Sequence, residues 1–480
     1  MSTNPNPGNP VDTGSHPSGQ KLINLIRGWP SPSLLAADLL LQSATTALTD
    51  PSIYVPGLQY GPDPGYGPLR EQLSQWLSEK YAVKPDVERI CVTGGASQSI
   101  ACILQGFTDP VYTRAAWVVA PMYFLAGPIF EDSGFYGTDG RLRGFGEDEE
   151  GPDVKELERE IQKMEQQKGA DEPTFKHPAP QRKIYRHVIY VVPTCANPSG
   201  VTMSLSRRHA LVNLARKYNA LIISDDVYDF LQWPVTTTPS TSPVPFIKPL
   251  PRLTDLDLPL GRSSHDPQDK HFGHAVSNGT FSKLIGPGVR TGWVEAAPNL
   301  AYGLSQTGST RSGGAPSQLV AAMITQLLKS HDVDTHVSTK VRPALQRRHA
   351  RIVQSIESEL GQFSISVRSE GEIGGGVAGG YFVWLTLPDG MSGKEVSERA
   401  REEENLVVAE GEMFEVRGDE RSPRFPSNLR LCFSWEEEGD VVEGVRRLGR
   451  VVKRMKENKG ERREGRFGNG DMSGNDISYK

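Results

Sequence analysis

One lysine lies in a short stretch whose residue types could carry out chemistry. The segment SNGTFSKLIGPGVRTGW, residues 277–293, places Lys283 between hydroxyl-bearing residues and a Gly-Pro-Gly turn, with Arg290 shortly after it. A lysine amine forms Schiff bases with aldehydes when a neighbouring positive charge or a dry pocket lowers its pKa. Thr280, Ser282 and Arg290 are residue types that bind phosphate. The segment therefore indicates a reactive lysine beside a phosphate site; a surface loop with a solvated lysine is the alternative.

Two other segments carry side chains that suit a ring-shaped cofactor. SDDVYDF contains Asp225 and, three residues later, Tyr228, which places the two on the same side of a turn. A carboxylate keeps a pyridine nitrogen protonated and a phenol bonds a ring hydroxyl, as an electron-sink cofactor requires. A helix cap or a metal-ligand pair made by Asp225 and Asp226 is the alternative. Asn197, in PTCANPSG, precedes a proline and so has a rigid, extended backbone, although turn formation alone would also explain it.

A glycine-rich turn completes the set. VTGGASQSI, residues 92–100, has the pattern of a strand, small residues and then a helix. Backbone N–H groups at a helix start attract anions, and glycines let a phosphate approach closely, so Gly95, Ala96 and Ser97 are candidate phosphate ligands. Helix–strand packing is the alternative reason for the glycines. Phosphate cradle, asparagine, aspartate–tyrosine pair and lysine nevertheless follow one another in the chain, each after an expected strand, and this combination favours one cofactor site.

The elements that must position these residues alternate between helices and strands. Apolar residues at helical spacing predict helices over residues 67–81, 96–107 and 206–220. Short β-branched runs predict strands buried on both faces at residues 117–121, 187–193 and 221–226. This alternation predicts an α/β fold with a mostly parallel central sheet wrapped by helices. Ligands of such a sheet bind beyond the carboxyl ends of its strands, which is where the candidate residues lie.

The rest of the chain divides into further segments. Strands at residues 379–388 and 428–435, with an acidic helix at 392–404 between them, predict a smaller α+β domain. We expect a disordered N-terminus at residues 1–20 and a disordered tail at 457–480. Between them we expect a segment at 21–55 that packs with the smaller domain, a large cofactor-binding domain at 56–330 and the smaller domain at 331–456. Polar composition indicates two insertions in the large domain, at about 165–183 and 234–273, the second being a long surface loop.

The composition excludes several classes of protein. The 480 residues are 37% apolar and carry a formal net charge of -5, so no basic excess points to nucleic acid. The four cysteines form no C-x-x-C pair, so we expect no metal site and no disulfide framework, and a reducing compartment. The N-terminus has no targeting pattern and no apolar stretch is long enough to span a membrane, so a cytoplasmic location is expected.

Taken together, these motifs resemble those of the pyridoxal-phosphate-dependent aminotransferases of fold type I, class I/II, over about residues 20–455 apart from the two insertions. The resemblance implies that Lys283 bears pyridoxal 5'-phosphate and moves the substrate's proton. It implies that Asp225 pairs with the ring nitrogen and that Tyr228 and Asn197 bond the ring oxygen. The family usually has Asn-Pro-Thr-Gly where this chain has Asn-Pro-Ser-Gly, a change that leaves Asn197 intact.

The resemblance also implies further cofactor ligands. The phosphate would be held by Gly95, Ala96, Ser97, Thr280, Ser282 and Arg290. Tyr123, in APMYF, matches the aromatic residue that stacks on the ring, although a buried tyrosine is an equal interpretation. Tyr60, in QYGPDPGYGPLR, matches a tyrosine that reaches the phosphate of the neighbouring subunit, which implies a homodimer with shared active sites.

Substrate residues follow from the same resemblance. Arg430, in NLRLCFSW, matches the arginine that binds the substrate's α-carboxylate with two parallel hydrogen bonds; a strand arginine in a surface ion pair is the alternative. NLIRGWPSPSLLAADLL resembles the 2-aminoadipate and aromatic aminotransferase branch, where this segment, with Arg27 and Gly28, closes over the substrate. Arg27 would then meet a distal carboxylate, whereas a solvated arginine is the plainer interpretation.

The implied reaction moves an amino group from an L-amino acid to a 2-oxo acid such as 2-oxoglutarate, with ping-pong kinetics. Aromatic, aminoadipate and branched-chain donors all fit the pattern. A carbon–sulfur lyase or related eliminating enzyme would share every cofactor residue. A non-catalytic regulator of this fold is a second alternative, but such regulators carry an added DNA-binding domain, and the N-terminal segment is too short for one. A structural protein without a cofactor is the remaining alternative.

Overall fold

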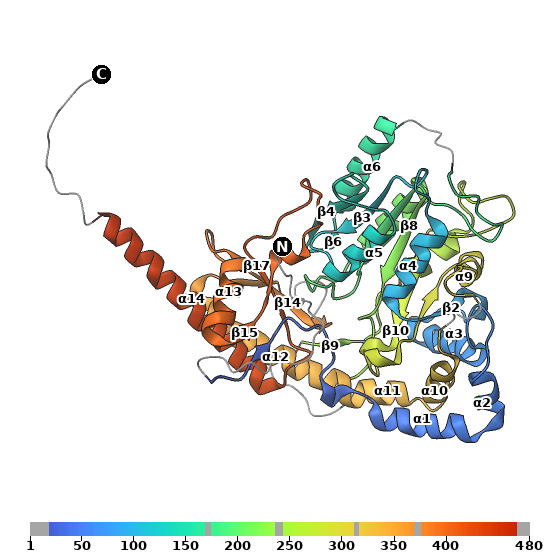
Figure 1. Cartoon of the computed structure of the whole chain (residues 1–480), viewed down its shortest axis with the longest axis horizontal. Helices are drawn as coiled ribbons and strands as arrows, with labels where there is room; N and C mark the ends of the chain where they lie inside the picture. The colour runs from blue at the N-terminus through green and yellow to red at the C-terminus, as the bar shows by residue number, and fades with distance from the viewer. Residues whose placement is uncertain (1–18, 169–173, 236–242, 312–315, 369–375, 468–480) are drawn as a thin grey trace.

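A seven-stranded sheet forms the centre of the molecule (Figure 1). The structure is a computed structural model, which describes residues 19–168, 174–235, 243–311, 316–368 and 376–467. In spatial order the strands are β2 Ile90–Thr93, β11 Gly292–Glu295, β10 Ala275–Thr280, β8 Ala220–Asp225, β7 His187–Val191, β3 Ala115–Val119 and β4 Leu142–Phe145. Neighbours pair in parallel except β11, which runs antiparallel to both β10 and β2. The predicted mostly parallel sheet is confirmed.

Helices cover both faces of this sheet because its strands are apolar on both sides. Along β7, Val188 and Tyr190 pack on one face with α4 Ala96–Phe107, α5 Gly127–Asp132 and α9 Pro298–Ser305. Ile189 and Val191 point to the other face, where α6 Val154–Lys168, α7 Leu205–Lys217 and α8 Leu253–Asp257 lie. Side chains alternate between the faces of a strand, so one apolar run supplies two cores.

A second sheet lies beside the first and is antiparallel throughout. Its order is β12 Ser366–Arg368, β14 Phe382–Thr386, β17 Asn428–Cys432 and β16 Ala409–Glu410. The helices of this part are α12 Arg342–Leu360, α13 Gly393–Glu404 and α14 Glu438–Phe467. The expectation that disorder begins at residue 457 is wrong, because α14 continues to Phe467. This stretch is rich in Glu, Lys and Arg, which are strong helix formers. Residues 468–480 and the expected disordered residues 1–18 lie outside the described chain.

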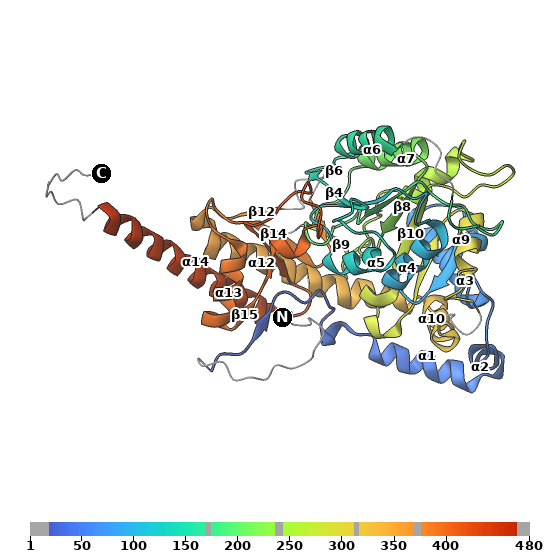
Figure 2. The same cartoon turned by 45° about the horizontal axis from the view of Figure 1, so that its top comes forward.

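The N-terminal segment contacts both parts of the fold. β1 Ile23–Asn24 pairs in parallel with β15 Leu406–Val407, beside the second sheet. α1 Ala37–Thr49 and α2 Pro51–Gly57 instead pack on α10 Gln318–Lys329 (Figure 2). The chain between β1 and α1 therefore bridges the two sheets.

The remaining elements complete the fold. They are α3 Gly67–Tyr81, α11 Asp332–His336, a π-helical turn Val337–Val341 and the small strands β5 Glu147–Asp148, β6 Gly151–Pro152, β9 Gln232–Pro234 and β13 Val377–Gly379. Turns of 3-10 helix occur at Pro32–Leu34, Val87–Arg89, Phe124–Ala126, Leu258–Leu260, Phe281–Lys283, Pro287–Val289, Gly361–Phe363 and Gly411–Phe414. Across the described ranges, we find no helix with the length and apolar character needed to cross a bilayer.

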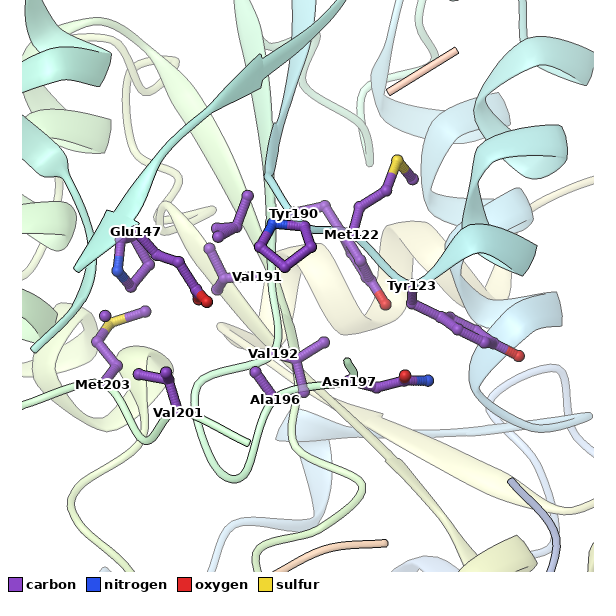
Figure 3. Close-up of a pocket in the computed structure, with 14 residues that line it drawn as sticks. Met122, Tyr123, Glu147, Tyr190, Val191, Val192, Ala196, Asn197, Val201 and Met203 are labelled. Atoms are coloured by element: carbon purple, nitrogen blue, oxygen red, sulfur yellow. The ribbon is translucent and has the colours of Figure 1, made fainter. Parts of the chain in front are cut away.

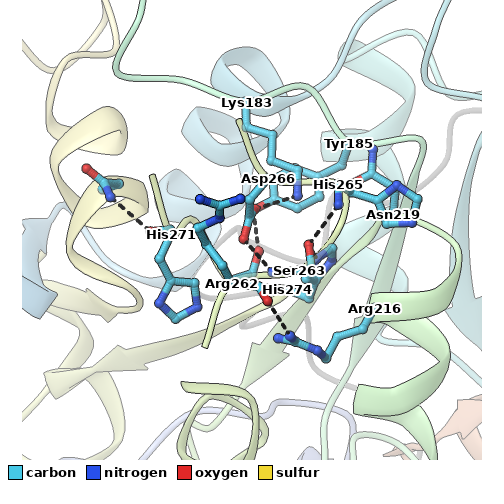
Figure 4. A network of polar contacts seen from close by, with 12 residues as sticks. Lys183, Tyr185, Arg216, Asn219, Arg262, Ser263, His265, Asp266, His271 and His274 are labelled. Atoms are coloured by element: carbon cyan, nitrogen blue, oxygen red, sulfur yellow. Dashed lines mark hydrogen bonds and ion pairs between the residues drawn. The ribbon is translucent and has the colours of Figure 1, made fainter. Parts of the chain in front are cut away.

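The described parts of the two insertions, residues 165–168, 174–183, 234–235 and 243–273, are more ordered than their composition indicates. The expected surface loop at 234–273 contains α8 and buries Arg252, whose guanidinium bonds Asp255 and Glu295. The first insertion begins within α6, and its last residue, Lys183, forms a buried ion pair with Asp266 of the second insertion, Nζ to Oδ1 2.9 Å (Figure 4). The polar composition did not predict this burial, because the buried groups are charged and pair with one another.

Candidate active site

A cavity of about 430 Å³ opens at the carboxyl ends of β7, β8 and β10. It lies between the first sheet, the N-terminal segment and the second sheet. The predicted residues that line it are Arg27, Gly28, Ala96, Ser97, Tyr123, Asn197, Asp225, Tyr228, Thr280, Ser282, Lys283, Arg290 and Arg430. Residues scattered over the whole sequence thus meet in one place, at the edge of the sheet where the alternation of elements predicts a ligand.

Lys283 ends the 3-10 turn that follows β10 and is half-buried at the wall of this cavity. Its Nζ donates a hydrogen bond to the Gly28 carbonyl oxygen at 3.0 Å and lies 5.0 Å from the Tyr381 ring centroid. Burial lowers the pKa of Lys283 to about 8, against the opposing effect of nearby Asp225. A substantial fraction of this amine is therefore neutral near pH 7, which a nucleophilic lysine requires.

Asp225 ends β8 and accepts two hydrogen bonds from neighbouring strands. Tyr190 of β7 donates its hydroxyl to Oδ2 at 2.8 Å, and Asn278 of β10 donates Nδ2 to Oδ1 at 3.3 Å. Burial raises the pKa of Asp225 to about 6, although the Tyr190 hydrogen bond and Lys283 lower it. A buried carboxylate held on both oxygens is a rigid partner for a cationic ring nitrogen.

Tyr190 and Asn278 are partners of Asp225 that were not predicted from the sequence. Tyr190 has a hydroxyl but lies inside a run of β-branched residues, and Asn278 has an amide side chain within a strand. Both features are weak sequence evidence for a functional role. Their role depends on strand pairing, since the register places Asn278 directly opposite Asp225.

Arg430 of β17 fixes the orientation of Asn197. Its side chain is buried, with Nη1 donating to Asn197 Oδ1 at 2.8 Å and Nη2 donating to the Ile26 carbonyl. A guanidinium only donates hydrogen bonds, so Asn197 must present its oxygen to Arg430 and its amide nitrogen elsewhere. The guanidinium carbon lies 4.1 Å from the Phe382 ring centroid. Burial lowers the pKa of Arg430 to about 10, which still leaves it charged at neutral pH.

One donor of Arg430 is left without a partner among the residues that the structure describes. Within the described ranges, its buried Nε has no hydrogen-bond partner. A buried cation without a carboxylate beside it costs free energy unless an anion binds. The α-carboxylate of an amino acid would supply that anion.

The start of α4 and the turn after β10 form a cradle for a phosphate. Gly95 caps the helix with φ of +108°, and a Cβ there would lie only 2.7 Å from Arg290 Nη2. Thr280 Oγ1 and Ser282 Oγ lie 2.9 Å apart on the other side. A helix N-terminus, two hydroxyls and a guanidinium are the groups that bind a phosphate dianion. Gly95 itself does not line the cavity, but its lack of a side chain lets Arg290 approach.

The N-terminal segment forms one wall of the cavity. A Cβ at Gly28 would lie 2.7 Å from the Phe382 ring, so only glycine allows this close approach. The Arg27 guanidinium carbon lies 5.2 Å from the ring centroids of both Trp29 and Trp435. This wall is therefore aromatic with one cation held between two indoles.

Tyr60 lies away from the cavity. Its side chain is 82% exposed, between α2 and α3, and it does not line the cavity of its own chain. The expectation that it serves a neighbouring subunit stays a prediction.

These residues fit pyridoxal phosphate by their chemistry. They offer an amine for an aldehyde, a buried carboxylate for a ring nitrogen, an oriented amide nitrogen for a ring oxygen and a phosphate cradle that a Cβ at Gly95 would obstruct. The cavity is also of the size that holds a cofactor together with a small substrate.

The chain is similar to known aminotransferases along most of its length. It is 34% identical to the uncharacterized protein YER152C of Saccharomyces cerevisiae, over 90% of this chain and 97% of that protein. It is 26% identical to the aromatic-amino-acid aminotransferase 1 of Thermococcus litoralis, over 90% and 88% of the two chains. It is also 26% identical to the 2-aminoadipate transaminase of Thermus thermophilus, over 90% of each chain.

A solved structure agrees with these similarities. The multiple substrate aminotransferase from Thermococcus profundus superposes with a TM-score of 0.70 at 25% identity, over 91% of this chain and 92% of that one. The family model described as aminotransferase class I and II matches residues 32–448. That match spans both sheets and every strand that borders the cavity. The chain therefore belongs to the class I and II aminotransferases, enzymes of the fold type I group that depend on pyridoxal phosphate.

Proposed function

We propose that this aminotransferase moves the amino group of an L-amino acid to a 2-oxo acid such as 2-oxoglutarate, by a ping-pong mechanism with pyridoxal 5'-phosphate. The observation that carries the proposal is that Lys283, Asp225, Asn197 and Arg430 line one cavity. Each is a residue type that the reaction needs, and their side chains meet although they come from four separate segments. Bound pyridoxal phosphate supplies an electron sink for the bond broken at the substrate's α-carbon.

The side chains of the chain then have distinct tasks. Arg430 binds the α-carboxylate of the amino acid and so orients its α-carbon. Lys283 removes the proton from that carbon and returns a proton in the next step, since its neutral amine is accessible near neutral pH. Asp225 supplies a negative charge to the ring nitrogen, and Asn197 and Tyr228 donate hydrogen bonds to the ring oxygen. Thr280 and the remaining residues of the phosphate cradle hold the phosphate.

The lining of the cavity supports aromatic and other large donors. Ile26, Trp29, Phe124 and Leu125 line the part of the cavity nearest the N-terminal segment and offer an apolar surface. Arg27 lies at the same wall and would bind the distal carboxylate of 2-aminoadipate. We therefore propose aromatic amino acids and 2-aminoadipate as donors, which is supported by the similarity to an aromatic-amino-acid aminotransferase and to a 2-aminoadipate transaminase.

We also propose a cytoplasmic homodimer with shared active sites. Apolar side chains are exposed along α1 and α2 and just beyond, including Leu41 at 69% and Leu58 at 61%. A second copy covering this face would bury them and would bring Tyr60 to the phosphate of the partner. Within each copy, we propose that residues 56–330 form the large domain and 331–456 the small one.

The absorption spectrum of the purified protein tests the proposed reaction. We expect a yellow band with pyridoxal phosphate that bleaches with a donor and returns with 2-oxoglutarate. Tyrosine, 2-aminoadipate and alanine are added separately, and Lys283→Ala is the control that should show neither change. Release of ammonia and a 2-oxo acid without a need for 2-oxoglutarate would instead identify an eliminating lyase, and a protein that never turns yellow would refute the role of Lys283.

A further inference from the structure

A buried carboxylate lies behind the wall of the cavity and has no part in the reaction described so far. Glu147 of β5 has a side chain that is only 4% exposed, and its Oε1 lies 2.7 Å from Nη1 of Arg368. Arg368 is the last residue of β12, so this ion pair joins the second sheet to a hairpin that follows β4 of the first. The Ser199 hydroxyl lies near the Glu147 carboxylate and lowers its pKa.

Ser199 belongs to the turn that carries Asn197. Within this turn the Ala196 amide donates to the Val201 carbonyl at 2.9 Å, and the Gly200 amide donates to the Ala196 carbonyl at 2.7 Å. These two bonds close the turn on itself, so residues 196–201 move together. A contact that holds Ser199 therefore holds Asn197.

A small cavity of about 20 Å³ lies between Glu147 and the active site (Figure 3). Figure 3 shows Glu147 on one side of it and Tyr123 and Asn197 on the other. Tyr123, Tyr190 and Asn197 border both this cavity and the main one, so they form the shared wall. The carboxylate lies directly behind residues proposed to contact the cofactor ring.

We propose that Glu147 is a positioning residue, whose ionised carboxylate holds the Asn197 turn against Arg368 and so sets how firmly Asn197 binds the cofactor's ring oxygen. The role of Asn197 in this inference rests on the proposed function. When Glu147 takes up a proton, the ion pair with Arg368 is lost and the turn is tied only by neutral hydrogen bonds, which are weaker than charge-assisted ones.

The charges around Glu147 set the pH at which this happens. Burial raises the pKa of Glu147 to about 7, Arg368 and the Ser199 hydroxyl lower it, and Asp148 raises it. The other ionisable groups at the small cavity are the phenols of Tyr123 and Tyr190, whose pKa values burial raises. Glu147 is thus the group of this wall that changes charge between pH 6 and pH 8.

Hydrogen–deuterium exchange of residues 196–203, corrected for intrinsic rates, tests the proposal in the cofactor-free and the cofactor-loaded protein. We expect exchange about fivefold faster at pH 6 than at pH 8, as loss of one net hydrogen bond predicts. Glu147→Gln keeps the size of the side chain and should exchange rapidly at both pH values. Its dissociation constant for pyridoxal phosphate at pH 8 should be about fivefold higher than that of the unchanged protein.

Two further variants separate this role from general stability. Arg368→Ala removes the ion pair itself, so residues 196–203 should exchange rapidly at pH 8 as well as at pH 6. Glu150→Gln alters an exposed carboxylate near the same hairpin and should behave like the unchanged protein.

Exchange that does not differ between pH 6 and pH 8, or that differs equally in Glu147→Gln, would overturn the proposal. Failure of every donor to bleach the yellow band would refute the proposed reaction instead, because the exchange measurement on the cofactor-free protein requires no turnover.

Discussion

At the scale of single residues, the titration of Lys283 makes a direct prediction. Burial lowers its pKa to about 8, so about one-tenth of the amine is neutral at pH 7 and nearly all of it at pH 9. Only the neutral amine would react with an aldehyde, so the rate constant for capture of pyridoxal phosphate should rise with pH, with its midpoint near pH 8, and level off above about pH 9. Stopped-flow absorbance measures this rate.

The charge of Asp225 supplies a control for that titration. Asp225 raises the pKa of Lys283, so Asp225→Asn should move the inflection of the capture rate to lower pH. An inflection near the ordinary lysine value, or no dependence on pH, would contradict burial as the source of the reactivity.

The Arg27 side chain is predicted to determine which donor the enzyme prefers. Arg27→Ala should lower kcat/KM for 2-aminoadipate about tenfold, the size of one charge-assisted hydrogen bond, and leave the value for tyrosine nearly unchanged. Steady-state kinetics with both donors provide the comparison. An equal fall for the two donors would show that Arg27 acts through its packing between Trp29 and Trp435 rather than by binding a side chain.

The residues of the site differ in how visible they are in the sequence. Lys283, Asp225 and Asn197 could be predicted because each follows a recognisable strand within a motif of unusual composition. Tyr190 and Asn278 could not, since they reach Asp225 only through the register of three strands. Glu147 is a further case, because its partners Ser199 and Arg368 are distant from it in the sequence.

At the scale of elements, the approach of Arg290 to the start of α4 depends on one glycine. Gly95→Ala places a Cβ at a φ of +108° and 2.7 Å from Arg290, so Arg290 must move away from the phosphate cradle. We expect the affinity for pyridoxal phosphate to fall about tenfold or more, as loss of a charge-assisted hydrogen bond predicts. Fluorescence titration measures that affinity.

Gly67 is the matched control for this substitution. It begins α3, and a Cβ there would meet nothing within 4 Å. Gly67→Ala should leave the affinity unchanged. If Gly95→Ala also binds the cofactor normally, the cradle is not built as proposed.

The second insertion carries the other prediction at this scale. Arg252 is fully buried, bonds Asp255 and Glu295, and lies with its guanidinium carbon 3.9 Å from the Tyr81 ring centroid. Arg252→Ala leaves two buried carboxylates without this partner and should lower the free energy of unfolding by about 3–5 kcal/mol. Urea unfolding measures it, with the exposed Arg262→Ala as a control expected within about 0.5 kcal/mol of the unchanged protein. Equal stability of the two variants would show that the contacts of Arg252 do not stabilise the fold and that the insertion behaves as a surface loop.

The elements themselves were predictable where apolar periodicity is strong. The helices α3, α4, α7 and α13 and the strands β3, β7, β8, β14 and β17 all lie where the sequence predicts them. The insertion was not predictable, because α8 is short and its neighbours are buried through paired charges rather than apolar residues. Periodicity detects apolar burial and does not detect buried ion pairs.

At the scale of the whole molecule, the alternation of strands and helices predicts the parallel sheet but not the order of its strands. The antiparallel β11 between β10 and β2 is one such feature, since it joins the lysine turn to the strand before the glycine-rich turn. That pairing brings the two halves of the phosphate cradle together. Long-range pairing of this kind has no local signature, so neither the strand order nor this pairing was predicted from the sequence.

The proposed homodimer is the last prediction. Leu41 is the most exposed of the apolar residues along α1, so Leu41→Lys places a charge in the expected interface, where an unpaired buried charge costs several kcal/mol. Sedimentation should show a dimer for the unchanged protein and a monomer for this variant. The monomer should also bind pyridoxal phosphate about fivefold more weakly, because it lacks the hydrogen bond of the partner's Tyr60. Leu205→Lys, which alters an exposed leucine at the start of α7, should remain a dimer. A monomeric unchanged protein with full activity would show that each active site is complete within one chain and that Tyr60 has no part in it.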